Sequence, residues 1–254
     1  MPTLFDPIAG LGPLALAVMV CGLAVGALAR GYSGFGFSAL LVASWSLVGA
    51  PAQAVAVALV LELTASVLQA ASVWRDVPWR RVGLLIAGAV VGTPLGVHLL
   101  AVTSERALRV GIALFILASA LVLLAGLRLR ARGTRATVMA VGLASGVCNG
   151  AVAMGGLPVA VFLTAEGADP RALRAAVVAY FFLLDLAGLF FLARAGLVRE
   201  GTLSLAVLAL PVLVGGMWLG GRHFLGATPD GFRRVTLVLL VLLATVGLAR
   251  ALAG

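Results

Sequence analysis

An arginine and several glycines interrupt an apolar region near the start of the chain, in the sequence RGYSGFGFSAL at residues 30–40. The candidate binding residues in this first cluster are Arg30, Gly31, Ser33, Gly34, Gly36 and Phe37. Glycine permits backbone dihedrals that break a helix, and a break at membrane depth leaves amide and carbonyl groups that need polar partners. A helix that restarts near Phe37 presents its N-terminal amides and the positive end of its dipole, which favour an anion. The first cluster therefore predicts an anion site.

A second cluster lies in the other half of the chain, in the sequence NGAVAMGGLPVA at residues 149–160. Its candidate binding residues are Asn149, Gly150, Met154, Gly155, Gly156 and Pro158. A helix that restarts near Leu157 carries Pro158 in its first turn, where the missing N–H costs little. Ser33 and Asn149 can supply further hydrogen-bond donors to an anion. The alternative for both clusters is that the glycines only allow helices to pack closely.

Charged side chains within the apolar segments are further candidates for function. Arg30 either attracts the anion or extends to the membrane interface, and the sequence leaves both open. Glu62 and Asp185 each lie inside a long apolar segment, where an acid is costly and usually functional, so we expect them to couple transport to protons. The alternative is that each acid pairs with an arginine or caps a broken backbone segment. A carboxylate beside a bound anion repels it, so we expect these acids to be protonated or to lie away from the substrate.

The composition identifies the elements that must position these residues. The chain has 254 residues, of which 63% are hydrophobic and 11% charged, with a mean hydropathy of +1.18. Soluble domains do not have this composition. Apolar stretches long enough to cross a bilayer recur at residues 8–29, 33–49, 51–74, 82–102, 105–127, 137–165, 171–194, 201–221 and 232–252. We therefore predict an all-α polytopic membrane protein with about eight transmembrane or re-entrant helical segments.

The net charge of +9 comes from 18 basic residues, all of them arginine and most of them in short loops. Membrane topology explains this distribution better than phosphate binding does, so we expect no nucleic-acid partner. The two histidines and two cysteines show no zinc-ligand spacing, and no nucleotide-binding motif occurs. We expect neither a metal site nor a cofactor.

The two halves of the chain share an internal pattern. One separation in sequence pairs Gly31 with Gly150, Pro51 with Pro170 and Gly96 with Gly215. We predict a first transmembrane repeat at 1–127, a basic cytoplasmic linker at 128–136 and a second repeat at 137–254. The repeats are parallel if each broken segment crosses fully and inverted if it is re-entrant, and the arginine distribution favours inverted repeats.

The paired segments GYSGFGFSALLVASWSLVGAPAQAVA and GLASGVCNGAVAMGGLPVAVFLTAEGADPRALRAA resemble those of the sulfite exporter TauE/SafE family. The resemblance covers nearly the whole chain. It implies a multi-pass permease of the bacterial inner membrane that moves sulfite, sulfonates or related sulfur-containing anions. Phe35 and Phe37 stand where more glycine is often seen in the family, which leaves the identity of the substrate open.

The broken helices predict a secondary transporter, not an enzyme, and the resemblance implies that it exports a small sulfur-containing anion such as sulfite or an organosulfonate. Backbone amides at the two broken helices would hold the anion, and one repeat would rock against the other to alternate access. The alternatives are an anion channel or an integral-membrane enzyme that uses Glu62, Asp185 and His98. The expected partners are the anion and the lipid bilayer, with assembly into a homodimer left open.

Overall fold

The computed structural model describes residues 10–34, 36–125, 133–167, 169–224, 238 and 241–249, and these residues form helices and no strand. The labelled helices are α2 (Pro13–Ser33), α3 (Phe37–Trp45), α4 (Pro51–Val73), α5 (Trp79–Val102), α6 (Glu105–Ala125), α7 (Arg135–Val152), α8 (Gly156–Ala165), α9 (Pro170–Arg194) and α10 (Glu200–Phe224). A short 3-10 turn at Trp74–Asp76 follows α4, and residues 241–249 are also helical. Residues 128–132 of the predicted linker lie outside the described residues.

The helices begin where the sequence supplies starting signals. Pro51 and Pro170 each occupy the first position of a helix, where a missing N–H leaves no hydrogen bond unmade. Asp169 caps α9 by accepting hydrogen bonds from the backbone amides of Arg171 and Ala172. Thr134, near the end of the predicted linker, caps α7 by accepting a hydrogen bond from the Thr137 amide. These caps fix where the long helices start relative to the broken segments between them.

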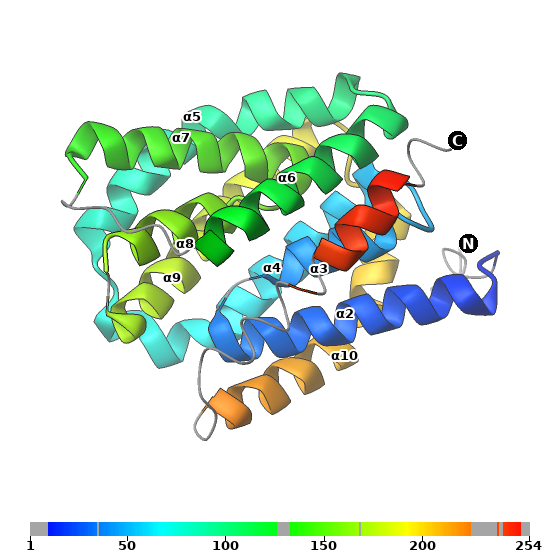
Figure 1. The fold of residues 1–254 in the computed structure, drawn as a ribbon, viewed down its shortest axis with the longest axis horizontal. Helices are drawn as coiled ribbons and strands as arrows, with labels where there is room; N and C mark the ends of the chain where they lie inside the picture. The colour runs from blue at the N-terminus through cyan, green and yellow to red at the C-terminus, as the bar shows by residue number, and fades with distance from the viewer. Residues whose placement is uncertain are drawn as a thin grey trace.

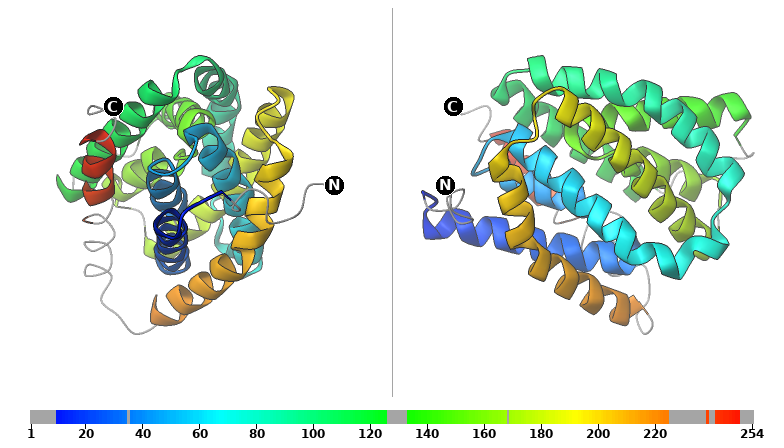
Figure 2. Two further views of the ribbon diagram at one scale, coloured as in Figure 1. Left: turned by 90° about the vertical axis from the view of Figure 1, so that its right-hand side faces the viewer. Right: turned by 180° about the vertical axis from the view of Figure 1, so that it is seen from behind.

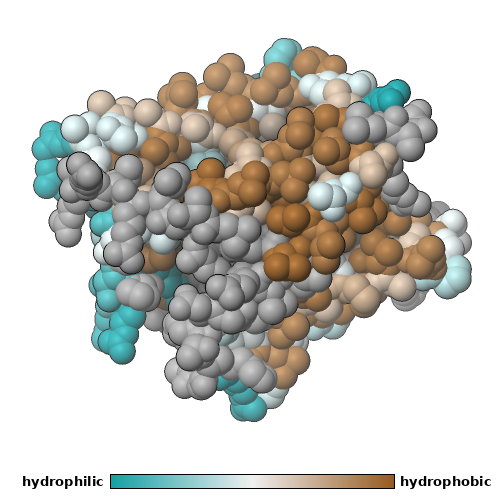
Figure 3. Space-filling view, in the orientation of Figure 1, coloured by the Kyte–Doolittle hydropathy of each residue, from teal (hydrophilic) through white to brown (hydrophobic). Residues whose placement is uncertain are grey.

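Five helices of the described part are long and apolar enough to cross a membrane: Pro13–Tyr32, Pro51–Ala71, Trp79–Val102, Arg171–Arg194 and Gly201–Arg222. Gly156–Ala165 is a shorter apolar helix. Large apolar side chains such as Val91, Leu95 and Leu203 point outward, and apolar residues cover much of the described surface in Figure 3. The chain is thus a multi-pass helical membrane protein, whereas the predicted number of about eight segments stays a prediction.

Each glycine cluster forms the tip of a helical hairpin. Helix α2 contacts α3 and helix α7 contacts α8, so the chain turns back on itself at both breaks. In Figure 1 the first hairpin starts at the right-hand end of the molecule and the second at the left-hand end. Helices α4 and α9 contact each other and pack against the hairpins, while α5 packs along α7 and α10 along α2 (Figure 2).

Glycines let the backbones of these outer helix pairs touch. A Cβ atom at Gly88, Gly92 or Gly96 of α5 would overlap the carbonyl oxygens of Met139, Leu143 and Val147 in α7, respectively. Such close approach requires residues without side chains, and it gives van der Waals contact along the whole pair of helices. These glycines of α5 therefore allow α5 and α7 to pack closely.

The contacts between α2 and α10 repeat those between α7 and α5 with the partners exchanged. Gly31 of α2 faces the carbonyl of Met217 in α10, and Gly150 of α7 likewise faces that of Thr93 in α5. In the other direction, Gly220 of α10 faces the carbonyl of Leu28, and Gly96 of α5 faces that of Val147. Leu28 and Val147 have the same separation in sequence as Gly31 and Gly150. Gly215, which the sequence pairs with Gly96, is exposed, and a Cβ atom there would meet nothing within 4 Å. Gly220 takes that place, since α10 lies a few residues further along the chain than the separation predicts.

Candidate functional site

The first break is made by two glycines in the left-handed region of backbone space. Gly34 ends α2 with φ 82° and ψ 1°, and its amide donates a hydrogen bond of 2.9 Å to the Arg30 carbonyl. Gly36 precedes α3 with φ 91° and ψ −6°. Residues with a Cβ rarely adopt these dihedrals, so the glycines are needed for the turn itself. Helix α3 begins at Phe37, where the sequence predicted a restart.

The second break is made differently. Ala153 adopts the left-handed conformation with φ 56°, and Gly155 precedes α8 with an ordinary helical φ of −61°. Helix α8 begins at Gly156, one residue before the predicted restart, and carries Pro158 in its first turn. Met154 is fully buried within the break. The two breaks are therefore similar in position but not in backbone conformation.

Arg30 is fully buried at the end of α2 and does not extend to a surface. Its Nη1 atom lies 3.3 Å from Glu62 Oε2 and also donates to the Gly34 carbonyl. Its Nη2 atom donates a hydrogen bond of 2.7 Å to the Ser66 hydroxyl on α4. The guanidinium carbon lies 4.5 Å from the ring centre of Phe181 on α9, which is a cation–π contact. Arg30 thus joins the first break to both central helices.

Glu62 reaches from α4 to the start of α3. Its Oε1 atom accepts a hydrogen bond of 3.2 Å from the backbone amide of Ser38, the second residue of that helix. The carboxylate therefore lies where the helix dipole and the first-turn amides favour negative charge. These contacts are those expected if the acid pairs with an arginine and caps a broken backbone segment, which was the alternative to proton coupling.

Asn149 and Asp185 form the corresponding pair at the second break. Asn149 Nδ2 donates a hydrogen bond of 3.1 Å to Asp185 Oδ1, and both side chains are fully buried. Asn149 Oδ1 accepts a hydrogen bond of 3.3 Å from the Gly155 amide. The Gly155 carbonyl in turn accepts from the Ser145 hydroxyl, which also hydrogen-bonds Tyr180 at 2.6 Å. This half of the site holds its broken backbone with neutral side chains and one acid.

The two breaks meet around Phe181. Its ring lies under the Arg30 guanidinium, and a Cβ atom at Gly156 would overlap the same ring. Gly156 is therefore needed for the close approach of α8 to α9. The pair Arg30–Ser66 and the pair Asn149–Asp185 have equal separations in sequence and occupy matching places in the two halves.

Some polar atoms of this central cluster have no hydrogen-bond partner among the described residues. They are Arg30 Nε, Asp185 Oδ2 and Glu62 Oε2, all on buried side chains, and the last lies 3.3 Å from Arg30 Nη1 as an ion pair. A buried polar atom without a partner is costly, and such atoms are rare away from functional sites. The cluster thus contains an unused cationic donor next to the start of a helix, which is the chemistry that an oxyanion requires.

The predicted site residues do not all lie at this cluster. Gly31 and Gly150 lie inside helices and pack against the backbones of α10 and α5, as the close-packing alternative expects. Gly155 is crowded by Asn149, Leu184 and the Ser145 carbonyl, whereas Gly36 has open space around it. The side chain of Ser33 lies outside the described part of the structure.

The sequence patterns did not identify the hydrogen-bonding partners Ser38, Ser66, Ser145 and Tyr180 or the aromatic ring of Phe181. Ser66 had a detectable signal, because the repeat separation pairs it with Asp185. Ser38 follows the predicted restart directly and could have been identified as a first-turn amide donor. Ser145, Tyr180 and Phe181 gave no signal, since nothing in an apolar helix tells which face meets the broken segment.

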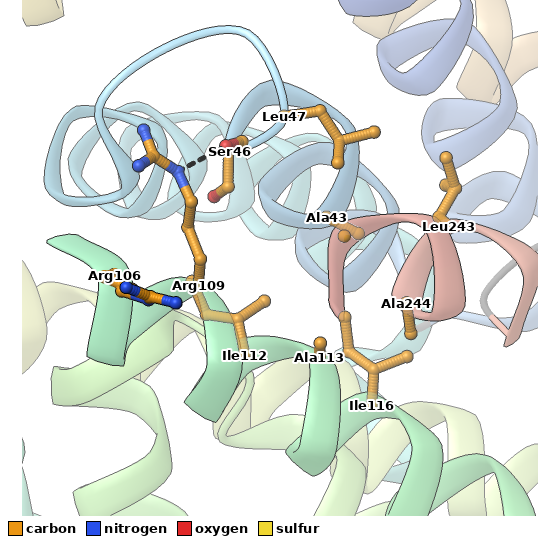
Figure 4. Close-up of a pocket in the computed structure, with 11 residues that line it drawn as sticks. Ala43, Ser46, Leu47, Arg106, Arg109, Ile112, Ala113, Ile116, Leu243 and Ala244 are labelled. Carbon is orange, nitrogen blue, oxygen red and sulfur yellow. Dashed lines mark hydrogen bonds between the residues drawn. The ribbon is translucent and has the colours of Figure 1, made fainter. Parts of the chain in front are cut away.

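A cavity of about 410 Å³ lies away from this cluster, between the end of α3, the start of α6 and residues 243–247 (Figure 4). Its walls are mostly apolar, with Arg106 and Arg109 at one end. Arg109 donates hydrogen bonds to the carbonyls of Ser46, at 3.0 Å, and Gly49, at 3.1 Å, so it anchors the loop after α3. None of the predicted site residues lines this cavity.

We expect replacement of Gly36 by alanine to weaken both folding and transport. The left-handed dihedrals cost a residue with a Cβ about 1–2 kcal/mol, and relief of that strain would turn the Ser38 amide away from its partner. Thermal unfolding in detergent and uptake into proteoliposomes measure the two effects. Gly83→Ala is the matched control, because Gly83 lies in α5 with open space around it and no left-handed φ. Equal stability of the two variants would contradict the role given to Gly36.

The sulfite exporter TauE/SafE family profile matches residues 18–246, nearly the whole chain. The matched range includes both breaks and all the residues of the central cluster. No curated protein and no solved structure matches the chain in the corresponding comparisons. The match therefore identifies a family of membrane transporters rather than an individual relative.

Proposed function

Because the chain belongs to the sulfite exporter TauE/SafE family, we propose that it is a secondary transporter that exports a small sulfur oxyanion across the bacterial inner membrane. The substrate class is sulfite or an organosulfonate. The anion binds at the first break, between Arg30 and the start of α3.

The observation that carries this proposal is that the buried Arg30 guanidinium and the Ser38 amide both contact the Glu62 carboxylate. An arginine presents several N–H donors in a plane and keeps its charge when buried, so it suits an oxyanion better than a lysine would. The first-turn amides of α3 add donors that point along the helix axis. A group with three oxygens on sulfur can accept from both at once.

The arrangement of the two halves supports alternating access. The residues of 1–127 and 137–254 make exchanged contacts, with α5 along α7 and α10 along α2. The two hairpins start at opposite ends of the molecule, as inverted repeats require (Figure 1). In this proposal the repeats rock around the central pair α4 and α9, and Asn149 and Asp185 hold the second break as its counterpart.

Uptake into proteoliposomes tests the proposal. Purified wild-type protein should give saturable uptake of sulfite and of methanesulfonate, and each anion should compete with the other. Uptake should respond to an imposed pH gradient, because the central cluster contains the acids Glu62 and Asp185.

The alternatives give different results in the same assay. Flux that does not saturate, at rates typical of channels, would contradict alternating access. Chemical conversion of the anion without flux would indicate an enzyme. Absence of any uptake or binding of both anions would contradict the assigned substrate class.

A further inference from the structure

The carboxylate of Glu62 has the contacts that the proposed function gives to the substrate. It lies 3.3 Å from the Arg30 guanidinium and 3.2 Å from the Ser38 amide. A substrate oxyanion needs this same cation and this same helix start. Two anions cannot share these donors, because like charges at such distances repel strongly in a buried site.

We propose that Glu62 is a built-in competitor that occupies the anion site when ionised and leaves it when protonated. The inference rests on the proposed function and adds how the binding of a proton is coupled to the binding of the substrate anion. Protonation neutralises the carboxyl group and frees Arg30 and the Ser38 amide for the substrate. Loss of the proton returns the carboxylate to both donors and expels the substrate. One proton therefore accompanies each anion that binds at this break.

The surroundings of Glu62 fit a displaceable group. Among the described residues, Arg30 of α2 and Asp185 of α9 interact with Glu62 directly, while Arg174 lies near Arg30, and Tyr180 and Cys148 lie near Asp185. Arg30 interacts with Glu62 and Asp185, and Arg174 adds positive charge near Arg30. Asp185 adds a second acid in electrostatic contact with Glu62.

The second break provides an internal comparison. There the Gly155 amide donates to the neutral side chain of Asn149, so no ionised group occupies the helix start directly. Asn149 stands at the position of Arg30 in the repeat, and Phe181 stands at the position of Glu62. Among the described residues, an acidic side chain at a helix start therefore occurs at the first break and not at the second.

The proposal predicts a definite dependence of binding on pH. A methanesulfonate anion keeps its charge between about pH 5 and about pH 8, so any change in its affinity reports on the protein. Affinity should be highest at low pH, where Glu62 is protonated. Above the point at which Glu62 loses its proton, affinity should fall about tenfold for each pH unit, because one proton is linked to one anion.

Binding of methanesulfonate to purified wild-type protein, E62Q and E166Q, measured by calorimetry across this pH range, tests the proposal. E62Q keeps a group that can accept from the Ser38 amide but carries no charge, so it should bind tightly at all pH values. Glu166 also pairs with an arginine, the partly exposed Arg81, and lies outside the site, so E166Q should follow the wild type.

The outcomes separate this inference from the proposed function. Wild-type binding that weakens with pH, together with pH-independent binding by E62Q, supports the inference. Wild-type binding with no pH dependence would overturn it while leaving the transporter intact, and this outcome does not require the variant to fold. Weaker binding by E62Q than by wild type at low pH would also overturn it, since Glu62 would then help to hold the anion. No binding by any of the proteins would contradict the proposed function itself.

Discussion

Replacement of Arg30 by methionine is expected to lower sulfite and methanesulfonate uptake by about 100-fold or more. Loss of a buried charge that hydrogen-bonds an anion costs about 2–5 kcal/mol, and each 1.4 kcal/mol is a factor of ten. The variant should also be less stable by about 3–5 kcal/mol, because Glu62 is left buried without its cation. Uptake into proteoliposomes and thermal unfolding in detergent measure these losses.

The double variant R30M/E62Q separates the two effects. Removal of both charges should restore much of the stability, since neither partner is left unpaired. Anion binding should stay as weak as in R30M, because the cation is still missing. Arg222→Met is a control, as the Arg222 guanidinium stacks on Trp218 near the end of α10 and has no part in the cluster. Wild-type affinity in R30M/E62Q would contradict a role for Arg30 in binding.

Replacement of Gly92 by leucine should prevent the protein from accumulating in a folded form. A side chain at this position meets the carbonyl of Leu143 and the amide of Val147, so it must push α5 away from α7. Overpacking against side chains costs about 1–3 kcal/mol, and the backbone offers no side chain that can move aside. We therefore expect a loss of about 3 kcal/mol or more, measured by size-exclusion profile and unfolding temperature in detergent.

Gly215→Leu is the matched control for this experiment. Gly215 lies in α10, is exposed and has no neighbour within 4 Å. Leucine has a higher helix propensity than glycine, so this variant should be as stable as the wild type or slightly more stable. Similar behaviour of Gly92→Leu and Gly215→Leu would show that the close contact of α5 with α7 contributes little.

The positions of the broken helices could be predicted because their cause is local. Gly34 and Gly36 adopt dihedrals that few other residues allow, so the chain must turn there and α3 must begin at Phe37. Local signals also mark the start of α9, where Asp169 caps the helix and Pro170 occupies its first position. Composition alone was enough to predict a helical membrane protein.

The contacts of the central cluster could not be predicted, because they depend on how distant helices are rotated. An acid in the middle of α4 can face lipid, another helix or a broken segment, and the sequence does not distinguish these. Only the packing of α4 against α3 brings Glu62 to the Ser38 amide. The same holds for Arg30, whose long side chain can reach either an interface or the protein interior. A sequence can therefore show which polar residues are costly to bury in a membrane, but not which partners offset that cost.

Localisation of a bound anion tests the central claim most directly. Selenite has the shape and charge of sulfite, and its selenium atom gives an anomalous X-ray signal. Crystals grown with selenite at low pH should show a selenium peak whose oxygens lie about 3 Å from the Arg30 guanidinium and the Ser38 amide, with Glu62 displaced. Selenium bound instead in the cavity lined by Arg106 and Arg109, with the Arg30–Glu62 pair intact, would contradict it.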